Sequence, residues 1–141
     1  MINSLTGTIA GVEEGMVFLE TDGGIEWAIQ VSATTQRALP RIGGTVRMLT
    51  YLHHRDDQMG LFGFRTPEER TVFLDLMKVG GIGTRQALRI LSGMTVEELV
   101  RSLDAEDVDA LARIPGLGKK TAQKMLLALR GKLSLTTQAE T

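Results

Sequence analysis

A segment of this chain occurs twice, 35 residues apart, and this repeat constrains the fold more than any other feature of the sequence. In residues 79–91 and 114–126, an apolar residue is followed by Gly-x-Gly and then by a segment with helical spacing. The aligned pairs are apolar at 79/114 and 82/117, glycine at 81/116 and 83/118, basic at 85/120 and 89/124, and alanine at 87/122. Helical solenoids also repeat with such periods, but they need three or more units. Two copies therefore indicate a duplicated motif of two helices joined by a tight hairpin.

Each Gly-x-Gly predicts a hairpin whose second helix starts with a place for an anion. The first glycine of each pair, Gly81 or Gly116, can adopt a positive φ that residues with side chains resist. The free N–H groups and the positive dipole end of the next helix attract a phosphate without reading base sequence. We expect the apolar residue inside each turn, Ile82 or Leu117, to be buried and to lock the hairpin.

Basic side chains extend each predicted anion site. Arg85 and Arg89 are four residues apart, as are Lys120 and Lys124, so each pair shares one helix face. Neither copy of the repeat contains an acidic residue. A lone Gly-x-Gly usually just ends a helix, but here both features occur twice at matching offsets. The combination favours binding of the DNA backbone by Gly81, Gly83, Thr84, Arg85, Arg89, Gly116, Gly118, Lys119, Lys120 and Lys124.

Neither Gly-x-Gly fits a nucleotide-binding loop. The dinucleotide fingerprint, Gly-x-Gly-x-x-Gly, needs a third glycine where this chain has Gln86 and Thr121. A P-loop needs Ser or Thr directly after its Gly-Lys pair, where this chain has Lys120. We therefore expect no ATP site and no cofactor.

The composition argues against several other classes of protein. The chain has a net charge of −1 and no cysteine, so neither a disulfide framework nor a cysteine-based zinc site is expected. His53 and His54 are neighbours on an expected strand, face opposite sides and cannot bind one metal together. The start of the chain lacks a leader pattern, and no apolar run approaches the roughly 20 residues that span a bilayer. We expect a cytoplasmic protein without metal or membrane contact.

Residues 1–64 predict a small β-barrel. Apolar residues alternate with polar ones in five or six short runs, and glycine-containing turns separate these runs. A helical or turn insert is expected at residues 32–39, ended by Pro40. A lone sheet of such strands would leave its edges open, which favours closure. We expect a barrel domain at residues 1–64, a helical domain at 65–133 and a polar tail at 134–141.

Capping signals mark the expected helices after the barrel. Thr66 and Glu69 predict a capping box with a proline at the first helical position, so Glu69 should reach back to the helix start. Residues 95–98 predict a second capping box. Asp104 is a good cap for a helix that runs to about residue 112.

The two hairpin sequences, residues 80–85 and 115–122, resemble helix-hairpin-helix motifs. Their order behind a small barrel resembles the RuvA family of Holliday-junction-binding proteins. Further agreement lies at residues 55–57, 61–64, 69–73 and 90–94, and the likeness covers essentially residues 1–133. The resemblance implies an α and β protein, with a barrel of the oligonucleotide-binding (OB) type followed by a helical domain that carries both hairpins.

The resemblance also implies a function and partners. It implies non-catalytic, sequence-independent binding of four-way junction DNA, held open for ATP-driven branch migration in recombination and repair. It implies a flat tetramer, or an octamer of two tetramers, with a RuvB-type motor and a RuvC-type resolvase as partners. A general DNA-binding scaffold without junction preference and a helix-hairpin-helix repair enzyme are the alternatives.

Asp56 and Asp57 lie in a segment that is similar to the family's acidic pin. From the residues alone, two acids beside a turn are most simply solvated. The resemblance instead implies that they lie at the junction centre and repel phosphates there. Two departures from the family pattern stand out: Thr84 replaces a frequent proline and is expected to cap the helix, and the tail leaves no room for the third domain that contacts the motor.

Overall fold

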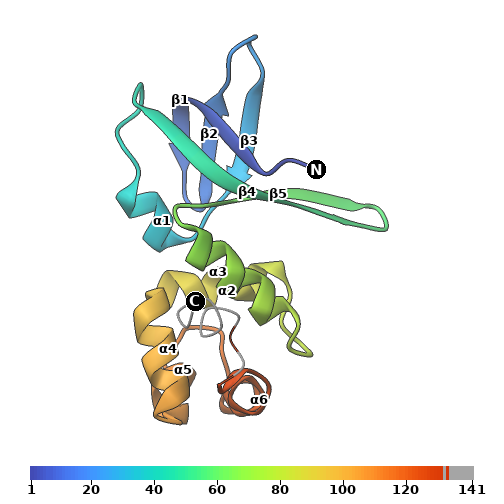
Figure 1. Ribbon diagram of the computed structural model, residues 1–141, viewed down its shortest axis with the longest axis vertical. Coiled ribbons are helices and arrows are strands. Elements are labelled where there is room, and N and C mark those ends of the chain that lie inside the picture. The colour runs from blue at the N-terminus through green and yellow to red at the C-terminus, as the bar shows by residue number, and fades with distance from the viewer. Residues whose placement is uncertain (132, 134–141) are drawn as a thin grey trace. The chain divides into compact units, whose positions relative to one another are not determined.

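The computed structural model describes residues 1–131 and 133, which form two compact units (Figure 1). The first unit is Met1–Arg70 and the second begins at Thr71. This division falls within a helix, shortly after the expected change from strands to helices at Phe64. The predicted polar tail, residues 134–141, lies outside the described residues.

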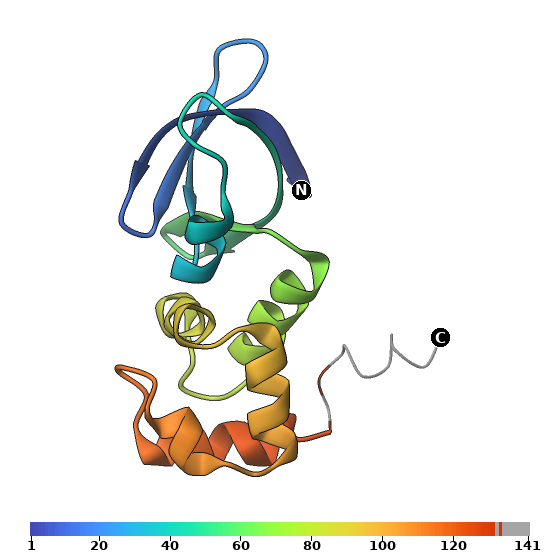
Figure 2. The same cartoon turned by 90° about the vertical axis from the view of Figure 1, so that its left-hand side faces the viewer.

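Five strands close into a small barrel, as the alternating pattern predicts (Figure 2). They are β1 (Ser4–Glu13), β2 (Met16–Glu20), β3 (Glu26–Gln30), β4 (Thr45–Arg55) and β5 (Gln58–Phe64). The order is β1-β2-β3-β5-β4, and β4 pairs back with β1, so no strand edge is left open along the barrel. Only β3 and β5 pair in parallel, at Gln30 and Phe62. This is a five-stranded barrel of the OB type.

Apolar side chains at alternate strand positions fill the barrel. The core consists of Ile9, Val17, Leu19, Ile29, Val31, Met48 and Leu61. Gly63 on β5 is required by this packing, because a Cβ there would lie 2.3 Å from Met48 Sδ and 2.6 Å from Ile29 Cγ2. The period-2 pattern of the sequence is thus the pattern of inward and outward positions.

A short helix, α1 (Ala33–Ala38), joins β3 to β4 and confirms the predicted insert. Ser32 is its N-cap, and the Ser32 hydroxyl accepts a hydrogen bond from the Thr35 N–H at 3.0 Å. Ser32 and Thr35 are both buried. Two hydroxyl groups therefore lie inside the first unit and need hydrogen-bond partners there.

A side chain in the first turn of α2 (Pro67–Met77) supplies those partners. The capping box predicted there is therefore only half correct. Thr66 Oγ1 accepts a hydrogen bond from the Glu69 N–H at 3.1 Å, as predicted. The predicted return bond from the Thr66 N–H is not formed; the Glu69 carboxylate instead accepts hydrogen bonds from the Ser32 hydroxyl at 3.1 Å, from Thr35 and from the backbone of Arg65, one residue before the cap. Buried hydroxyls without a partner are costly, and this carboxylate supplies their acceptor.

Burial raises the pKa of the Glu69 carboxyl above its ordinary value, because the charged form loses its water. The hydroxyls of Thr35 and Ser32 oppose this shift, as do the backbone and charge of Arg65. Glu69 is a titratable group that the sequence pattern assigned only to a helix cap.

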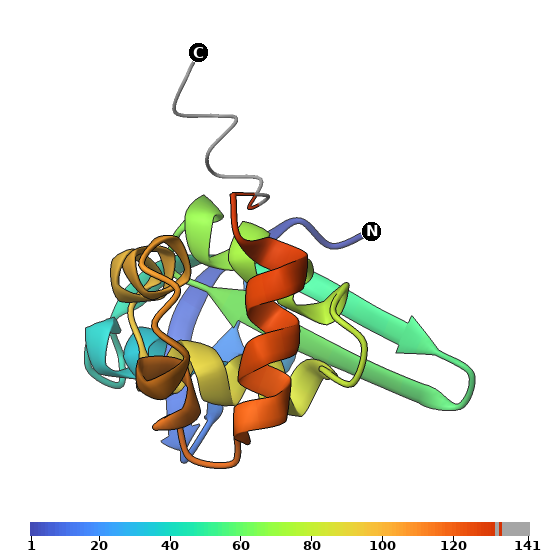
Figure 3. The same ribbon diagram turned by 90° about the horizontal axis from the view of Figure 1, so that it is seen from below.

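The second unit contains the rest of α2 and, in its described part, four more helices: α3 (Thr84–Gly93), α4 (Val96–Asp104), α5 (Val108–Ala112) and α6 (Lys119–Leu129). Its buried apolar residues include Phe73, Leu76, Val79, Ile82, Ile90, Leu91, Leu99, Leu103, Leu111, Ile114, Leu117, Met125 and Leu129. Figure 3 shows the loop that leads from α5 into α6. No helix in residues 1–131 has both the length and the apolar character needed to span a bilayer.

The caps of α4 and α5 confirm one prediction and correct another. Thr95 and Glu98 form the complete predicted capping box at the start of α4. Asp104 is not a cap: it is the last residue of α4, and Asp107 caps α5 by accepting a hydrogen bond from the Ala110 N–H at 3.0 Å. Leu103, one residue before Asp104, is buried and belongs to the same helix.

Candidate nucleic-acid interface

The two Gly-x-Gly segments fold into hairpins with the same backbone bonds. In the first, the Ile82 N–H donates to Val79 O at 3.1 Å; in the second, the Leu117 N–H donates to Ile114 O at 3.0 Å. The helices that follow begin alike, with bonds of 3.0 Å from Ala87 N to Gly83 O and from Ala122 N to Gly118 O. The repeat of 35 residues in the sequence is therefore a repeat of backbone conformation.

Both predictions about the turn residues are confirmed. Gly81 has a φ of 89° and Gly116 has a φ of 83°, a region that L side chains rarely adopt. Ile82 and Leu117 are only 5% and 4% exposed, so each hairpin is anchored in the core of the helical unit. Glycine supplies the turn and the apolar residue fixes it.

Both helices after the hairpins start without a capping side chain. Among the six helices of residues 1–131, four have a side chain that accepts a hydrogen bond from the first turn: Ser32, Thr66, Thr95 and Asp107. The N-caps of α3 and α6 are Gly83 and Gly118, which make no such bond. The first N–H groups of these two helices are thus left for another acceptor.

Thr84 does not cap α3 as expected. Gly83 is the N-cap and Thr84 is the first helical residue, the position where proline is also well tolerated. Thr84 therefore fits the start of the helix without capping it, and it provides an N–H group that a proline there would lack.

The predicted basic residues lie on the exposed surface of the two helices. Arg85 and Arg89 are exposed on α3, and Lys119, Lys120 and Lys124 are exposed on α6. No acidic residue lies within the second copy of the repeat, residues 114–126, but acidic side chains from other parts of the chain lie near basic residues of α6 and of the turn after it. Lys119 Nζ lies 4.0 Å from Asp109 Oδ1, and Arg130 pairs with Glu106. Surface pairs of this kind are weak, so they moderate the positive charge without cancelling it.

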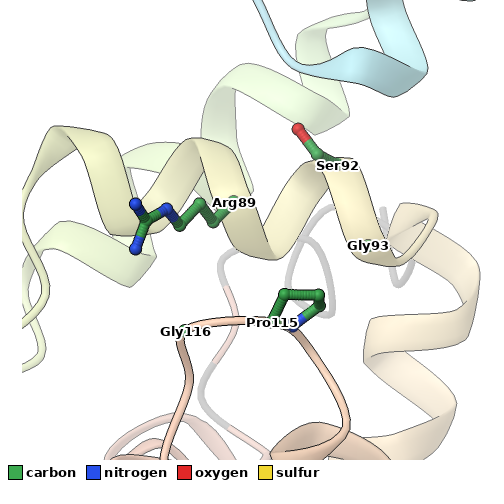
Figure 4. A pocket seen from close by; sticks show the side chains of 5 residues that line it. All are labelled: Arg89, Ser92, Gly93, Pro115 and Gly116. Carbon is green, nitrogen blue, oxygen red and sulfur yellow. The ribbon is translucent and has the colours of Figure 1, made fainter.

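One side chain of α3 lies at the other hairpin. A Cβ added to Gly116 would lie 2.7 Å from Arg89 Nη1, which places the guanidinium against the second turn. Gln86, on the same helix, donates a hydrogen bond from Nε2 to Gly116 O at 3.2 Å. Arg89, Ser92, Gly93, Pro115 and Gly116 line an open pocket of about 470 Å³ (Figure 4). Local sequence gives no signal for these contacts, and Gln86 was not a predicted site residue.

Asp56 and Asp57 form the turn between β4 and β5. The hairpin of these strands extends beyond the rest of the barrel, with this turn at its free end (Figures 1 and 3). Both side chains are exposed, and Asp56 has a φ of 48°, which aspartate tolerates better than most residues. The structure thus brings two carboxylates together at the tip of a projecting arm.

His53 and His54 are adjacent on β4, as expected. Within residues 1–131 and 133, no group of three or more His, Asp or Glu side chains is arranged to hold a metal ion.

The fold and the paired hairpins define the class of protein: an OB-type barrel followed by a tandem helix-hairpin-helix domain. Residues 1–63 match the family described as RuvA N terminal domain, and residues 73–132 match the SAM-like helix-hairpin-helix tandem.

Several relatives carry the name Holliday junction branch migration complex subunit RuvA. The protein of Treponema denticola is 51% identical over 95% of this chain and 66% of its own length. The protein of Neisseria gonorrhoeae is 46% identical over 94% of this chain and 68% of its own length. The protein of Delftia acidovorans is 41% identical over 99% of this chain and 73% of its own length. The chain belongs to the RuvA family. It spans slightly less than two thirds of the Treponema relatives that it matches.

Proposed function

We propose that this chain binds four-way junction DNA through backbone phosphates, as the non-catalytic DNA-holding subunit of a branch-migration complex. The observation that carries the proposal is the pair of uncapped helix starts, each preceded by a glycine hairpin and followed by exposed basic residues. Such helix starts bind phosphate groups without reading bases. The choice of four-way junction DNA as the ligand rests on the relatives named as Holliday junction branch migration complex subunits.

Each hairpin would contribute one phosphate clamp. The hairpin glycines let the DNA backbone approach the main chain, the helix N–H groups bind phosphate oxygens, and the lysines and arginines neutralise neighbouring charges. The proposed contacts are Gly81, Gly83, Thr84 and Arg85 in the first clamp and Gly116, Gly118, Lys119, Lys120 and Lys124 in the second, together with Arg89 on α3, the helix of the first motif.

The acidic turn would select the shape of the DNA. In a four-fold assembly on a junction, the tips with Asp56 and Asp57 would meet at the centre. Their negative charge would repel the phosphates at the crossover and keep the arms apart. The proposal thus combines attraction along the arms with repulsion at their meeting point.

The wider assembly belongs to the same proposal. We assign residues 1–64 to the barrel domain and 65–133 to the DNA-binding domain of a tetramer, or of two stacked tetramers, in the cytoplasm. A RuvB-type ATPase would supply the motor activity, and a RuvC-type resolvase would act on the same DNA. The relatives extend beyond the part matched here, and the proposal assigns motor contact to none of the residues described above.

A competition experiment tests the proposal. Labelled four-way junction is bound to the chain and challenged with unlabelled junction or with linear duplex of the same total length and sequence. We expect junction to compete at concentrations at least tenfold lower. Equal competition would support a general scaffold, and strand cleavage or base excision on damaged duplex would support a repair enzyme. Affinity should fall steeply with salt, whereas a flat response would contradict phosphate clamping.

A further inference from the structure

The two hairpins are joined by side chains of one helix. Gln86 and Arg89 lie three residues apart on α3, the helix after the first hairpin, and so share a face. Both contact Gly116 in the turn of the second hairpin: Gln86 through a hydrogen bond of 3.2 Å, and Arg89 through its guanidinium. The helix α3, which completes the anion site of the first hairpin, therefore also contacts the turn of the second hairpin.

Arg89 is poorly explained as a structural residue. It is exposed, and within the described part of the chain its guanidinium has no hydrogen bond and no carboxylate partner. By contrast, Lys119 faces Asp109 and Arg130 pairs with Glu106. An arginine that lies beside a glycine turn and the open pocket, with its five donors unused, can receive a phosphate.

The glycine at position 116 makes room for this arginine. A side chain there would come within 2.7 Å of Nη1 and displace the guanidinium. The equivalent Gly81 in the first hairpin has the same left-handed backbone, but a Cβ there would meet no atom within 4 Å. The two turns are thus alike in backbone and different in what lies against them.

We propose that Arg89, although it belongs to the helix of the first motif, binds the phosphate held by the second hairpin, and that Gln86 fixes the spacing between the two hairpins. The proposal rests on the phosphate-clamp function and adds a coupling between the clamps. Because one helix carries parts of both sites, the spacing of two bound phosphates is set before DNA arrives. Such preorganisation lowers the entropic cost of binding.

Double-mutant cycles on junction binding test the assignment. Arg89→Gln should weaken binding on the order of tenfold and lower the slope of log affinity against log salt by about 1 for each subunit that contacts DNA. Its effect should be smaller in a Lys120→Gln background, because both residues serve the same phosphate, and unchanged in an Arg85→Gln background. Arg101→Gln, which removes an exposed arginine from α4, is the control for lost charge.

Gly116→Ala and Gly81→Ala form a matched pair. Both should lose similar stability, since both put alanine at a positive φ. In the Gly116→Ala background the guanidinium is already displaced, so adding Arg89→Gln should change affinity less than twofold. In the Gly81→Ala background Arg89→Gln should keep its full effect. Gln86→Ala should weaken binding without changing the salt slope, because it removes no charge.

The outcomes separate this inference from the function on which it rests. If the unaltered chain does not prefer junction DNA, the proposed function fails. If it does, but Arg89→Gln behaves like Arg101→Gln or couples to Arg85 rather than to Lys120, the assignment of Arg89 to the second hairpin is overturned while the function stands. Circular dichroism and thermal unfolding of each variant ensure that binding is compared between folded proteins.

Discussion

Thr35 Oγ1 lies 2.7 Å from one carboxylate oxygen of Glu69 and 2.6 Å from the other. A hydroxyl carries a single proton and cannot donate fully to both oxygens at once. A protonated Glu69 could return one of the two bonds by donating to Thr35. The geometry agrees with the raised pKa of this buried carboxyl, whose largest cause is desolvation.

Replacing Glu69 by Gln should change how stability depends on pH. In the native protein, the folded state holds the Glu69 proton more tightly than the unfolded state, since the folded pKa is raised. This contribution to stability is therefore present at low pH and is lost as pH rises from the ordinary pKa of a glutamate through the raised one. Glu69→Gln should remove that slope and leave the protein at least as stable near neutral pH.

Urea unfolding across this pH range measures the effect, and Glu68→Gln, at the exposed neighbouring position, is the control. An unchanged pH slope in Glu69→Gln would show that this carboxyl does not titrate differently on folding. Glu69→Leu should be destabilising at every pH, by about 1–3 kcal/mol, because the buried hydroxyls lose their acceptor.

The pair between Lys119 and Asp109 predicts unequal roles for neighbouring lysines. Asp109 lies 4.0 Å from the Lys119 ammonium and offsets part of its charge, whereas Lys120 has no acidic partner in the described residues. Lys120→Gln should therefore weaken DNA binding more than Lys119→Gln. Asp109→Asn should strengthen binding about twofold, with Asp104→Asn as control, in mobility-shift titrations at fixed salt. Weaker binding by Asp109→Asn would contradict the proposed position of the phosphate.

The acidic turn is predicted to affect the preference for junction over linear duplex DNA, rather than the strength of junction binding. Asp56→Asn with Asp57→Asn keeps the size of both side chains, and asparagine tolerates the φ of 48° at position 56. Binding to linear duplex should rise, and the preference for junction over duplex should fall several-fold. Asp22→Asn, in the turn between β2 and β3, should change neither quantity. A preference that stays the same in the double variant would exclude the turn from junction selection.

The anchors of the hairpins predict a cost in stability. Leu117→Ala removes a side chain that is 4% exposed and should lower the free energy of unfolding by about 2–4 kcal/mol. Leu127→Ala, on the next helix but 82% exposed, should cost less than about 0.5 kcal/mol. Chemical denaturation of the two variants compares the same substitution at a buried and at an exposed position. Equal losses of unfolding free energy would show that the turn is not anchored through Leu117.

Features with a local physical cause were predictable from the sequence. The positive φ of Gly81 and Gly116 follows from the special freedom of glycine, and the capping box of Thr95 and Glu98 joins residues three positions apart. Strand alternation in residues 1–64 predicted the barrel because the period of a strand is the period of its burial. The repeat itself indicated two equivalent hairpins before any contact was known.

Other features depend on residues that meet only after folding. The sequence directed Glu69 to its own helix start, but hydroxyls 34 and 37 residues away claim the carboxylate. Asp104 was predicted to cap the next helix, but α4 continues through it and Asp107 is the cap of α5. Arg89 was placed correctly on a helix face, yet its nearness to Gly116 arises from the packing of two motifs.

The sequence by itself thus determined the two hairpins, their shared backbone form and the barrel before them, because short-range backbone geometry and side-chain alternation specify these. Only the tertiary structure decided which side chains lie beside which hairpin, which lysine has an acidic neighbour and where the buried carboxylate finds its partners. These depend on distances across the fold, and periodicity along the chain carries no information about them.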